Sequence, residues 1–132
     1  MSQETFIFND TLLNNITLYN EYSDEDINKA IEFSLLDSLK DRKINENSNL
    51  QDTLSGGERK KIGLARAILN DTDVILLDEL NSSLDSTSSK ILEDRIFDLK
   101  DKTIVMVTHK INYHNLVKAD EIICMDDGEI VE

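Results

Sequence analysis

The 132-residue chain lacks proline and tryptophan, has a single cysteine, and carries 14 basic against 27 acidic side chains. One cysteine excludes a disulfide scaffold, and Cys124, inside an apolar run, is expected to be a buried thiol in a reducing compartment. A net charge of −13 argues against general binding to nucleic acid or to an anionic membrane, because such binding needs clustered lysine and arginine. No apolar run approaches the ~20 residues that span a bilayer, and no secretion-signal pattern opens the sequence, so we expect a soluble chain.

The hydrophobic residues, 39% of the chain, recur in periodic blocks, which is typical of a folded domain. Three helix starts are predicted. Asp10 or Thr11 caps a short helix, Ser23 caps a second that ends near Leu39, and the S-x-x-E capping box at residues 55–58 opens a third. The polar, Asn-rich stretch between the last two predicts a loop.

Continuous apolar runs follow at residues 74–77, 103–107 and 122–125, and such runs are typical of parallel strands covered on both faces. A helix is predicted over about residues 86–99, so strand, helix and strand form a βαβ unit. Its expected inward residues are Ile91, Leu92, Ile96 and Leu99. A turn then leads to a small terminal strand at 129–131, and the fold class predicted for this half is α/β.

Residues 55–58 (SGGE) are a candidate anion site, because glycines at a helix start let a ligand approach exposed backbone N–H groups. The alternative is a glycine loop that only caps the helix. Asp78 and Glu79 end the first strand, where α/β sheets bind ligands, so Asp78 could hold Mg²⁺ and Glu79 could polarise water. His109 ends the next strand and could contact a phosphate. The alternatives are a strand that exits into a polar loop and a structural histidine.

The sequence resembles the nucleotide-binding domains of ABC transporters, especially those of exporters. Residues 54–58 resemble the signature motif and 59–69 its helix, and 74–79 are similar to the Walker B strand with its catalytic glutamate. The remaining motifs are a D-loop at 83–85, a switch histidine at 108–109, a Q-loop at 2–4 and a closing strand pair at 125–132. The resemblance implies a partial P-loop NTPase core with a helical subdomain. Departures from the family are Leu80, Asn81 and Ser83. The loop before the signature also matches poorly, so Glu46 is only a weak candidate for the exporter contact with the partner's membrane domain.

The resemblance also implies a role for each matched residue. Gln3 would contact Mg²⁺ and sense the membrane domain, Asp78 would support the metal, Glu79 would be the base on water, and His109 would hold the γ-phosphate. Ser55, Gly56 and Gly57 would close over ATP on the opposite domain of a head-to-tail dimer, with Asp85 at the seam. The expected division is a helical subdomain with the signature helix at about residues 10–70 and an α/β core at 71–132. The run at 59–61 is interpreted as a solvated helix face, and the alternative is that it draws an anion toward the signature loop.

No phosphate loop of the form G-x-x-x-x-G-K-[ST] occurs, so we expect weak ATP binding by this chain alone. The resemblance then makes the chain the second half of such a domain, from a truncated gene, a split gene or an artificial boundary. The strand that leads into the phosphate loop, normally central, is missing. The runs at Val105 and Ile123 must therefore pair directly, borrow a strand from another chain, or leave open edges. We expect a rearranged or oligomeric core.

Three functional readings follow. The first is the catalytic portion of an exporter ATPase that acts with ATP and Mg²⁺ once a phosphate-loop lobe is supplied. The second is an interaction module that offers the signature residues in trans without hydrolysis, and the third is a lobe of a split chromosome-maintenance ATPase, against which Gln3 argues. Expected partners are a second ABC ATPase domain and an exporter's transmembrane domain, at the cytoplasmic face of the cell membrane, with no nucleic acid. Self-association through the unpaired strands is a further expectation.

Overall fold

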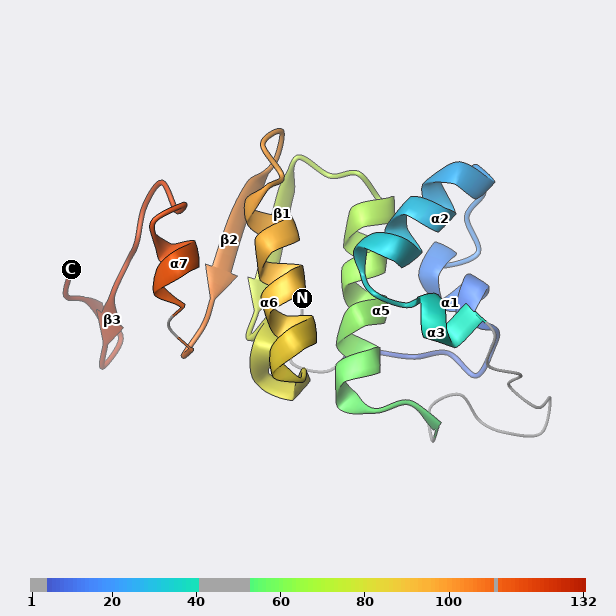
Figure 1. The fold of residues 1–132 in the computed structure, drawn as a ribbon, viewed down its shortest axis with the longest axis horizontal. Helices are drawn as coiled ribbons and strands as arrows, with labels where there is room; N and C mark the ends of the chain where they lie inside the picture. The colour runs from blue at the N-terminus through green and yellow to red at the C-terminus, as the bar shows by residue number, and fades with distance from the viewer. Residues whose placement is uncertain (1–4, 41–52, 111) are drawn as a thin grey trace.

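The computed structural model describes residues 5–40, 53–110 and 112–132, which form a mixed α/β fold. The N-terminal helices gather at one end, the helix over residues 56–69 stands between them and a small parallel sheet, and a short hairpin lies at the opposite end (Figure 1). In chain order the elements are α1 (Leu12–Thr17), α2 (Asp24–Phe33), α3 (Asp37–Lys40), α5 (Gly56–Leu69), β1 (Val74–Asp78), the 3₁₀ helix η1 (Leu80–Ser83), α6 (Ser86–Phe97), β2 (Thr103–Val107), α7 (Tyr113–Leu116), β3 (Met125–Asp126) and β4 (Glu129–Ile130).

The N-terminal helices close a hydrophobic cluster against one side of α5. Thr11 Oγ1 accepts a hydrogen bond from Asn14 N at the start of α1, and Ser23 Oγ accepts one from Asp26 N at the start of α2. Both predicted helix starts are thus confirmed, with Thr11 as the first cap. The buried members of the cluster are Ile7, Ile16, Ala30, Ile31, Leu36, Leu39, Leu54, Ile62, Ala65 and Leu69.

Arg66 joins α5 to the start of the described chain. Its Nε donates to the Asn15 carbonyl at 2.6 Å, and its Nη1 donates to the Phe6 carbonyl at 2.8 Å. Burial lowers the pKa of Arg66 from its ordinary value, and the two carbonyl acceptors compensate part of the lost hydration. The guanidinium therefore connects α5 to two residues that lie 51 and 60 positions earlier in the sequence.

The sheet consists of β1 and β2, which run parallel with Val74 opposite Thr103 and Asp78 opposite Val107. Helix α6 connects them, so the predicted βαβ unit is confirmed. One face of the sheet is covered by α6 and α5. The buried side chains of this second cluster are Leu64, Ile75, Leu77, Leu80, Leu92 and Ile96.

The prediction that both faces of these strands are covered is wrong for the described part of the chain. The opposite face presents Leu76 at 57% exposure and Val74, Val105 and Val107 at 51% each. These side chains alternate with the buried ones because successive residues of a strand point to opposite faces. No helix or strand within the described ranges covers them, so each of these side chains is more than half exposed. We call Val74, Leu76, Val105 and Val107 the open sheet face.

The third predicted strand, at 122–125, is also wrong. Only Met125 lies in a strand, β3, which pairs antiparallel with β4 to form the predicted closing strand pair. Ile122 and Ile123 are more than half exposed, and Cys124 is exposed rather than buried. Since this run has no face to pack against among the described residues, its apolar character alone does not make it a strand. Within those residues β2 pairs only with β1, and its outer edge is open.

Two helix details correct the sequence-based expectations. Helix α2 ends at Phe33, not near Leu39, because Leu35 takes the left-handed conformation, with φ of 56°, in which a right-handed helix cannot continue. The break lets a separate turn, α3, carry Leu39 into the helical cluster. In α6, Ile91 is 37% exposed instead of inward, since the buried side of that helix carries Leu92 and Ile96.

Candidate active site

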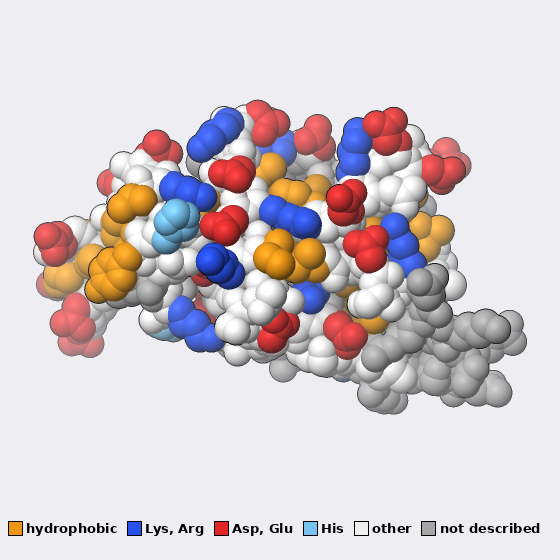
Figure 2. Space-filling model, viewed as in Figure 1, with side chains coloured by type: hydrophobic (Ala, Val, Ile, Leu, Met, Phe, Trp, Pro, Cys, Tyr) orange, Lys and Arg blue, Asp and Glu red, His pale blue; other side chains and the backbone are white. Residues whose placement is uncertain are grey.

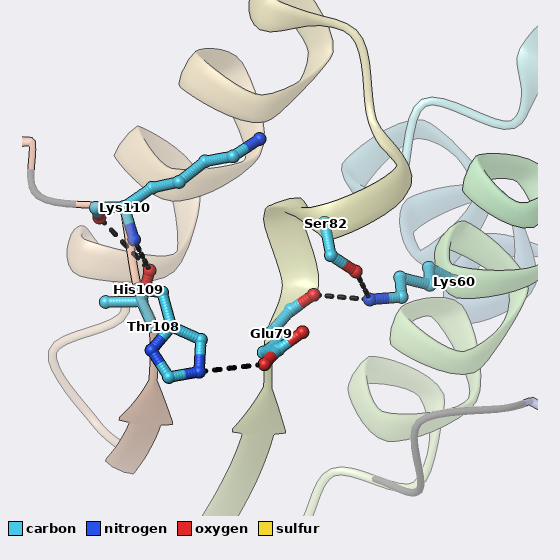
Figure 3. Close-up of polar contacts among 6 residues, drawn as sticks. All are labelled: Lys60, Glu79, Ser82, Thr108, His109 and Lys110. Atoms are coloured by element: carbon cyan, nitrogen blue, oxygen red, sulfur yellow. Dashed lines mark hydrogen bonds and ion pairs between the residues drawn. The ribbon is translucent and has the colours of Figure 1, made fainter.

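Glu79 and His109 meet where the two parallel strands end (Figure 3). The Glu79 backbone N–H donates to the Val107 carbonyl at 2.9 Å, which extends the pairing of β1 and β2 by one position. Glu79 Oε1 lies 3.0 Å from His109 Nε2, and the imidazole is 81% exposed while the carboxylate is 29% exposed. A carboxylate in contact with a solvent-facing imidazole can accept a proton from water on the open side.

The backbone of Glu79 is in the left-handed region, at φ 45° and ψ 47°, where a glutamate is uncommon. Lys60 of α5 holds this turn from the opposite side. Its Nζ donates to the Glu79 carbonyl and to Ser82 Oγ, so both contacts of the ammonium reach the segment that carries the carboxylate (Figure 3). Residues in strained conformations persist where the surroundings determine them, and they cluster at functional sites.

Lys60 is 6% exposed, so the prediction that residues 59–61 form a solvated helix face is wrong at this position. A buried ammonium needs acceptors, and the carbonyl and hydroxyl of the Glu79 turn supply them. The sequence contains a pattern that could have predicted the burial of Lys60. Gly57, Lys60 and Leu64 are three and four residues apart and therefore share one side of α5, and all three are buried.

Ser55 forms the predicted capping box at the start of α5. Its Oγ accepts from Glu58 N at 3.2 Å, and Glu58 Oε2 accepts from Ser55 N at 2.7 Å. Ser55 and Gly56 are exposed, whereas Gly57 is buried. A Cβ on Gly57 would lie 2.6 Å from the Ser83 carbonyl oxygen, and one on Gly56 would lie 3.4 Å from Ser83 Oγ. The glycine at position 57 therefore lets α5 pack directly on η1, and the proposed anion contact remains a prediction.

Asp85 begins α6 as its N-cap, with Oδ1 accepting from Ser88 N at 2.9 Å. Hydrogen bonds from the Ser88 side chain and backbone hold the pKa of Asp85 below its usual range. Asp85 follows Ser83 by two residues, so the structure brings the predicted D-loop next to the start of the predicted signature helix. Gln3 and Glu46 lie outside the described residues.

Asp78 is the last residue of β1 and is half-buried beside Glu79. Among the residues that the structure describes, no three His, Cys, Asp or Glu side chains gather as a metal site. A magnesium ion that is shared with substrate phosphates takes only one or two protein carboxylates, so Asp78 fits as a single ligand. The chain supplies no phosphate cradle, because the glycine-rich loop is absent from its sequence. The residues present thus fit part of a magnesium–nucleotide site and not the whole.

Across the described ranges, no helix is both long and apolar enough to cross a membrane. Hydrophobic side chains nevertheless reach the surface over α7 and the C-terminal hairpin, at the left of Figure 2. Exposed members in this part of the chain include Tyr113, Val117, Ile122, Ile123, Met125, Ile130 and Val131.

Comparison with known proteins adds a family match. A family model described as ABC transporter matches residues 2–82. The chain is 37% identical to an ATP-dependent lipid A-core flippase of Vibrio vulnificus (strain CMCP6) and 39% identical to one of Photorhabdus laumondii, and the similarity covers 100% of this chain and 24% of each relative. The chain therefore spans about a quarter of the length of these relatives.

A solved structure, that of a bacterial Atm1-family ABC exporter with ATP bound, superposes with a TM-score of 0.84 at 22% identity. It covers 99% of this chain and 24% of the exporter chain. This similarity shows that the α/β arrangement described above is the fold of the matching part of that exporter. The matching part includes the strand ends that carry Glu79 and His109.

Proposed function

The chain belongs to the ABC transporter family, and from that premise we propose that it is the part of an exporter's ATP-binding domain that carries the hydrolytic pair and the signature segment. The observation that carries the proposal is the 3.0 Å contact between Glu79 and His109 at the carboxyl ends of two parallel strands. Open α/β sheets bind their ligands outside that edge. ATP hydrolysis is the reaction that this placement supports.

The roles of the individual residues follow from their chemistry. ATP bound by a complete domain would supply the γ-phosphate that water attacks. Glu79 accepts the proton of that water, and His109 lies at the same edge, where its exposed imidazole could contact the γ-phosphate. Asp78 provides one carboxylate for Mg²⁺. Gln3 is proposed as a second contact to the metal ion.

The signature residues are proposed to act on a different nucleotide from the one at Glu79. Ser55 and Gly56 are exposed at the start of α5, where backbone N–H groups and the helix dipole favour an anion. Gly57 keeps α5 close to η1, and Asp85 lies at the other end of that contact. We propose that this surface faces a second ABC ATPase domain in a head-to-tail pair.

A phosphate-loop lobe is the proposed cover of the open sheet face. The four side chains of the open sheet face are apolar and alternate with buried ones, which is the pattern of strands covered on both faces. Large exposed apolar faces mark interaction sites. The alternative is a second copy of this chain, which would pair with the open edge of β2. In that case the chain should self-associate as its concentration rises.

We propose that the helical cluster contacts the transmembrane domain of the exporter. We propose residues of about 10–70 as the helical subdomain and 71–132 as the α/β core, at the cytoplasmic face of the membrane that holds the transporter. The relatives named above are flippases of lipid A-core. Choice of a lipid would belong to a membrane domain, so ATP hydrolysis is the activity that the residues of this chain could supply.

The test is MgATP hydrolysis by the 132-residue chain, alone and with a phosphate-loop lobe of an ABC exporter supplied in trans. We expect turnover only with the lobe, and we expect Glu79→Gln to lower it by about 10²–10⁴-fold, the usual contribution of a general base. Glu121→Gln, an exposed carboxylate outside the site, is the matched control and should hydrolyse like the unaltered chain. Turnover by the chain alone would contradict the need for a lobe.

The second candidate is a non-hydrolytic interaction module, which the missing phosphate loop and the exposed signature turn favour. In that case the chain would raise hydrolysis by an intact ABC ATPase domain through Ser55 and Gly56. Glu79→Gln would then leave the rate unchanged, while Ser55→Ala would lower it. The two variants together separate the candidates.

A further inference from the structure

Glu93 of α6 is a buried carboxylate that lies outside every motif named above. It is 7% exposed, on the side of the helix that also carries Leu92 and Ile96. Its Oε1 accepts from Asn81 Nδ2, and its Oε2 accepts from Asn112 Nδ2 and from Asn115 Nδ2, each at 2.8 Å. We call these four side chains the Glu93 cluster. A buried carboxylate must be satisfied by donors, and here the donors that the structure shows are neutral amides.

The three donors come from the two segments that carry the proposed hydrolytic pair. Asn81 stands in η1, two residues after Glu79, whereas Asn112 and Asn115 follow His109 by three and six residues. A second connection runs directly between the segments, since Lys110 Nζ donates to the Asn81 carbonyl at 3.1 Å. Glu93 therefore links the Glu79 turn to the chain that leaves His109, although its three hydrogen bonds go to neither of these two residues.

The orientation of the amides is determined by the carboxylate. An ionised carboxylate only accepts hydrogen bonds, so each asparagine must turn its NH₂ group toward Glu93. In consequence, Asn81 Oδ1 and Asn115 Oδ1 are buried without a partner among the described residues. Asn81 is 4% exposed and Asn115 is 2% exposed, so neither acceptor gains water easily. The orientation of these two amides therefore depends on Glu93, because their oxygens have no hydrogen-bond partner among the described residues.

We propose that Glu93 is a positioning residue: through Asn81 and Asn112 it sets the approach of Glu79 to His109. The inference rests on the proposed function only in assigning hydrolysis to Glu79 and His109. The geometric part concerns contacts within this chain and is open to a test that needs no nucleotide. A purely structural role would stabilise the fold without changing how His109 senses Glu79.

The experiment measures that sensing by NMR. The chain has two histidines, so the imidazole signals of His109 are assigned by comparison with His114→Gln. Glu79→Gln is then introduced into three backgrounds: the unaltered chain, Glu93→Gln and Asp94→Asn. Asp94 is the neighbouring carboxylate of α6, and its ion-pair partner is Lys118, at 3.7 Å. The measured quantity is the change that Glu79→Gln causes in the His109 chemical shifts.

We expect a clear shift change in the unaltered and Asp94→Asn backgrounds and its loss in Glu93→Gln, with circular dichroism showing that each variant is folded. The same change in all three backgrounds would overturn the proposal. If Glu93→Gln does not fold, Asn112→Ala replaces it, because this variant removes one amide from the His109 side and leaves the carboxylate. A full response in Asn112→Ala would then count against Glu93, and a reduced response would support it.

Hydrolysis with a phosphate-loop lobe gives a second measurement that can fail separately. A positioning role predicts that Glu93→Gln lowers kcat with little change in KM, and that Glu93→Asp, which keeps the charge, restores part of the rate. If no variant, including the unaltered chain, hydrolyses ATP, the proposed function fails while the NMR result stands. If hydrolysis is unaffected by Glu93→Gln, the positioning role is wrong and the proposed function stands.

Discussion

The helical end and the sheet end of the molecule differ in how completely they bury their apolar residues. The helical cluster is closed, with side chains from α1, α2 and α5 packed on one another and Arg66 holding the N-terminal segment in place. In the part of the chain that the structure describes, the sheet is covered on one side and largely exposed on the other, and residues 121–132 are all exposed. A helix needs one buried stripe, whereas a central strand needs two covered faces. Helices α1, α2, α3 and α5 thus complete one core together, whereas the described strands leave one face of the sheet exposed.

Two neighbours on β1 give the largest expected contrast. Leu77 is 1% exposed in the second cluster, and Leu76 is 57% exposed on the open sheet face. Leu77→Ala should lower the free energy of unfolding by about 2–5 kcal/mol, the usual effect of emptying a core position. Leu76→Ala should change it by about 0.5 kcal/mol or less. Urea unfolding of both variants is the measurement, and equal losses would show that the open face is covered in solution.

Lys60 stands between the two regions, and its loss should have the next largest effect. Lys60→Met keeps most of the side-chain volume but leaves the Glu79 carbonyl and Ser82 Oγ without this donor. We expect a loss of about 1–3 kcal/mol, as for a buried polar group that loses its partner. Lys61→Met is the control, since Lys61 Nζ donates to Ser88 Oγ, at 3.2 Å, rather than to the Glu79 turn. A similar loss in both variants would mean that general charge effects, not the Glu79 turn, dominate.

The capping box of α5 should matter to both regions, because this helix borders each of them. Ser55→Ala removes the acceptor for Glu58 N and should cost about 1 kcal/mol. Faster amide hydrogen exchange in the first turn of α5 should accompany the loss. Ser23→Ala, which removes the cap of α2, should change exchange in the helical end alone. Unchanged exchange in α5 of the Ser55 variant would show that packing on η1 holds this turn without the cap.

The smallest expected effect is that of the ion pair that ties β2 to the end of α5. Lys102 Nζ lies 2.7 Å from Asp71 Oδ1, and this contact lowers the pKa of Asp71 and raises that of Lys102. The Asp71 contribution is present above its ordinary pKa of 3.8 and is lost as pH falls through the lowered value. The Lys102 contribution is present below 10.5 and is lost as pH rises through the raised value.

Asp71→Asn should therefore lower the urea midpoint slightly at neutral pH and not at all in strong acid. High salt should also shrink the difference, because the aspartate is exposed and ions screen such pairs. A difference that persists in acid would assign the effect to the backbone instead, since Asp71 has a positive φ of 48°. The measurement is the difference in urea midpoint between the two chains from acid to alkaline pH.

The sequence predicted the elements whose signals are local. The capping box at Ser55, the cap at Ser23 and the apolar runs of β1 and β2 are confirmed because each depends on a few adjacent residues. It failed where the outcome depends on distant partners. Ile123 reads as a strand residue but has no strand beside it among the described residues, and Leu35 breaks a helix so that Leu39 can reach the cluster.

The candidate site divides in the same way. Asp78, Glu79 and His109 were predicted from strand ends, and the structure brings the last two into contact. Lys60 and Glu93 were missed, because a charged side chain in a helix ordinarily predicts solvent exposure. Both are buried through acceptors or donors supplied by other elements, which no single stretch of sequence reveals. The one sequence pattern that indicated the burial of Lys60 was its helical spacing from Gly57 and Leu64.

The contacts of Arg66 have a consequence for the order in which a ribosome could let this molecule fold. The guanidinium that holds the Phe6 and Asn15 carbonyls is made after everything that it secures. Helices α1 and α2 contain 6 and 10 residues, and isolated helices shorter than about 12–15 residues are marginal in water. The helical end therefore cannot close its core until α5 has been synthesised, because Ile62, Ala65 and Leu69 of that helix are part of it.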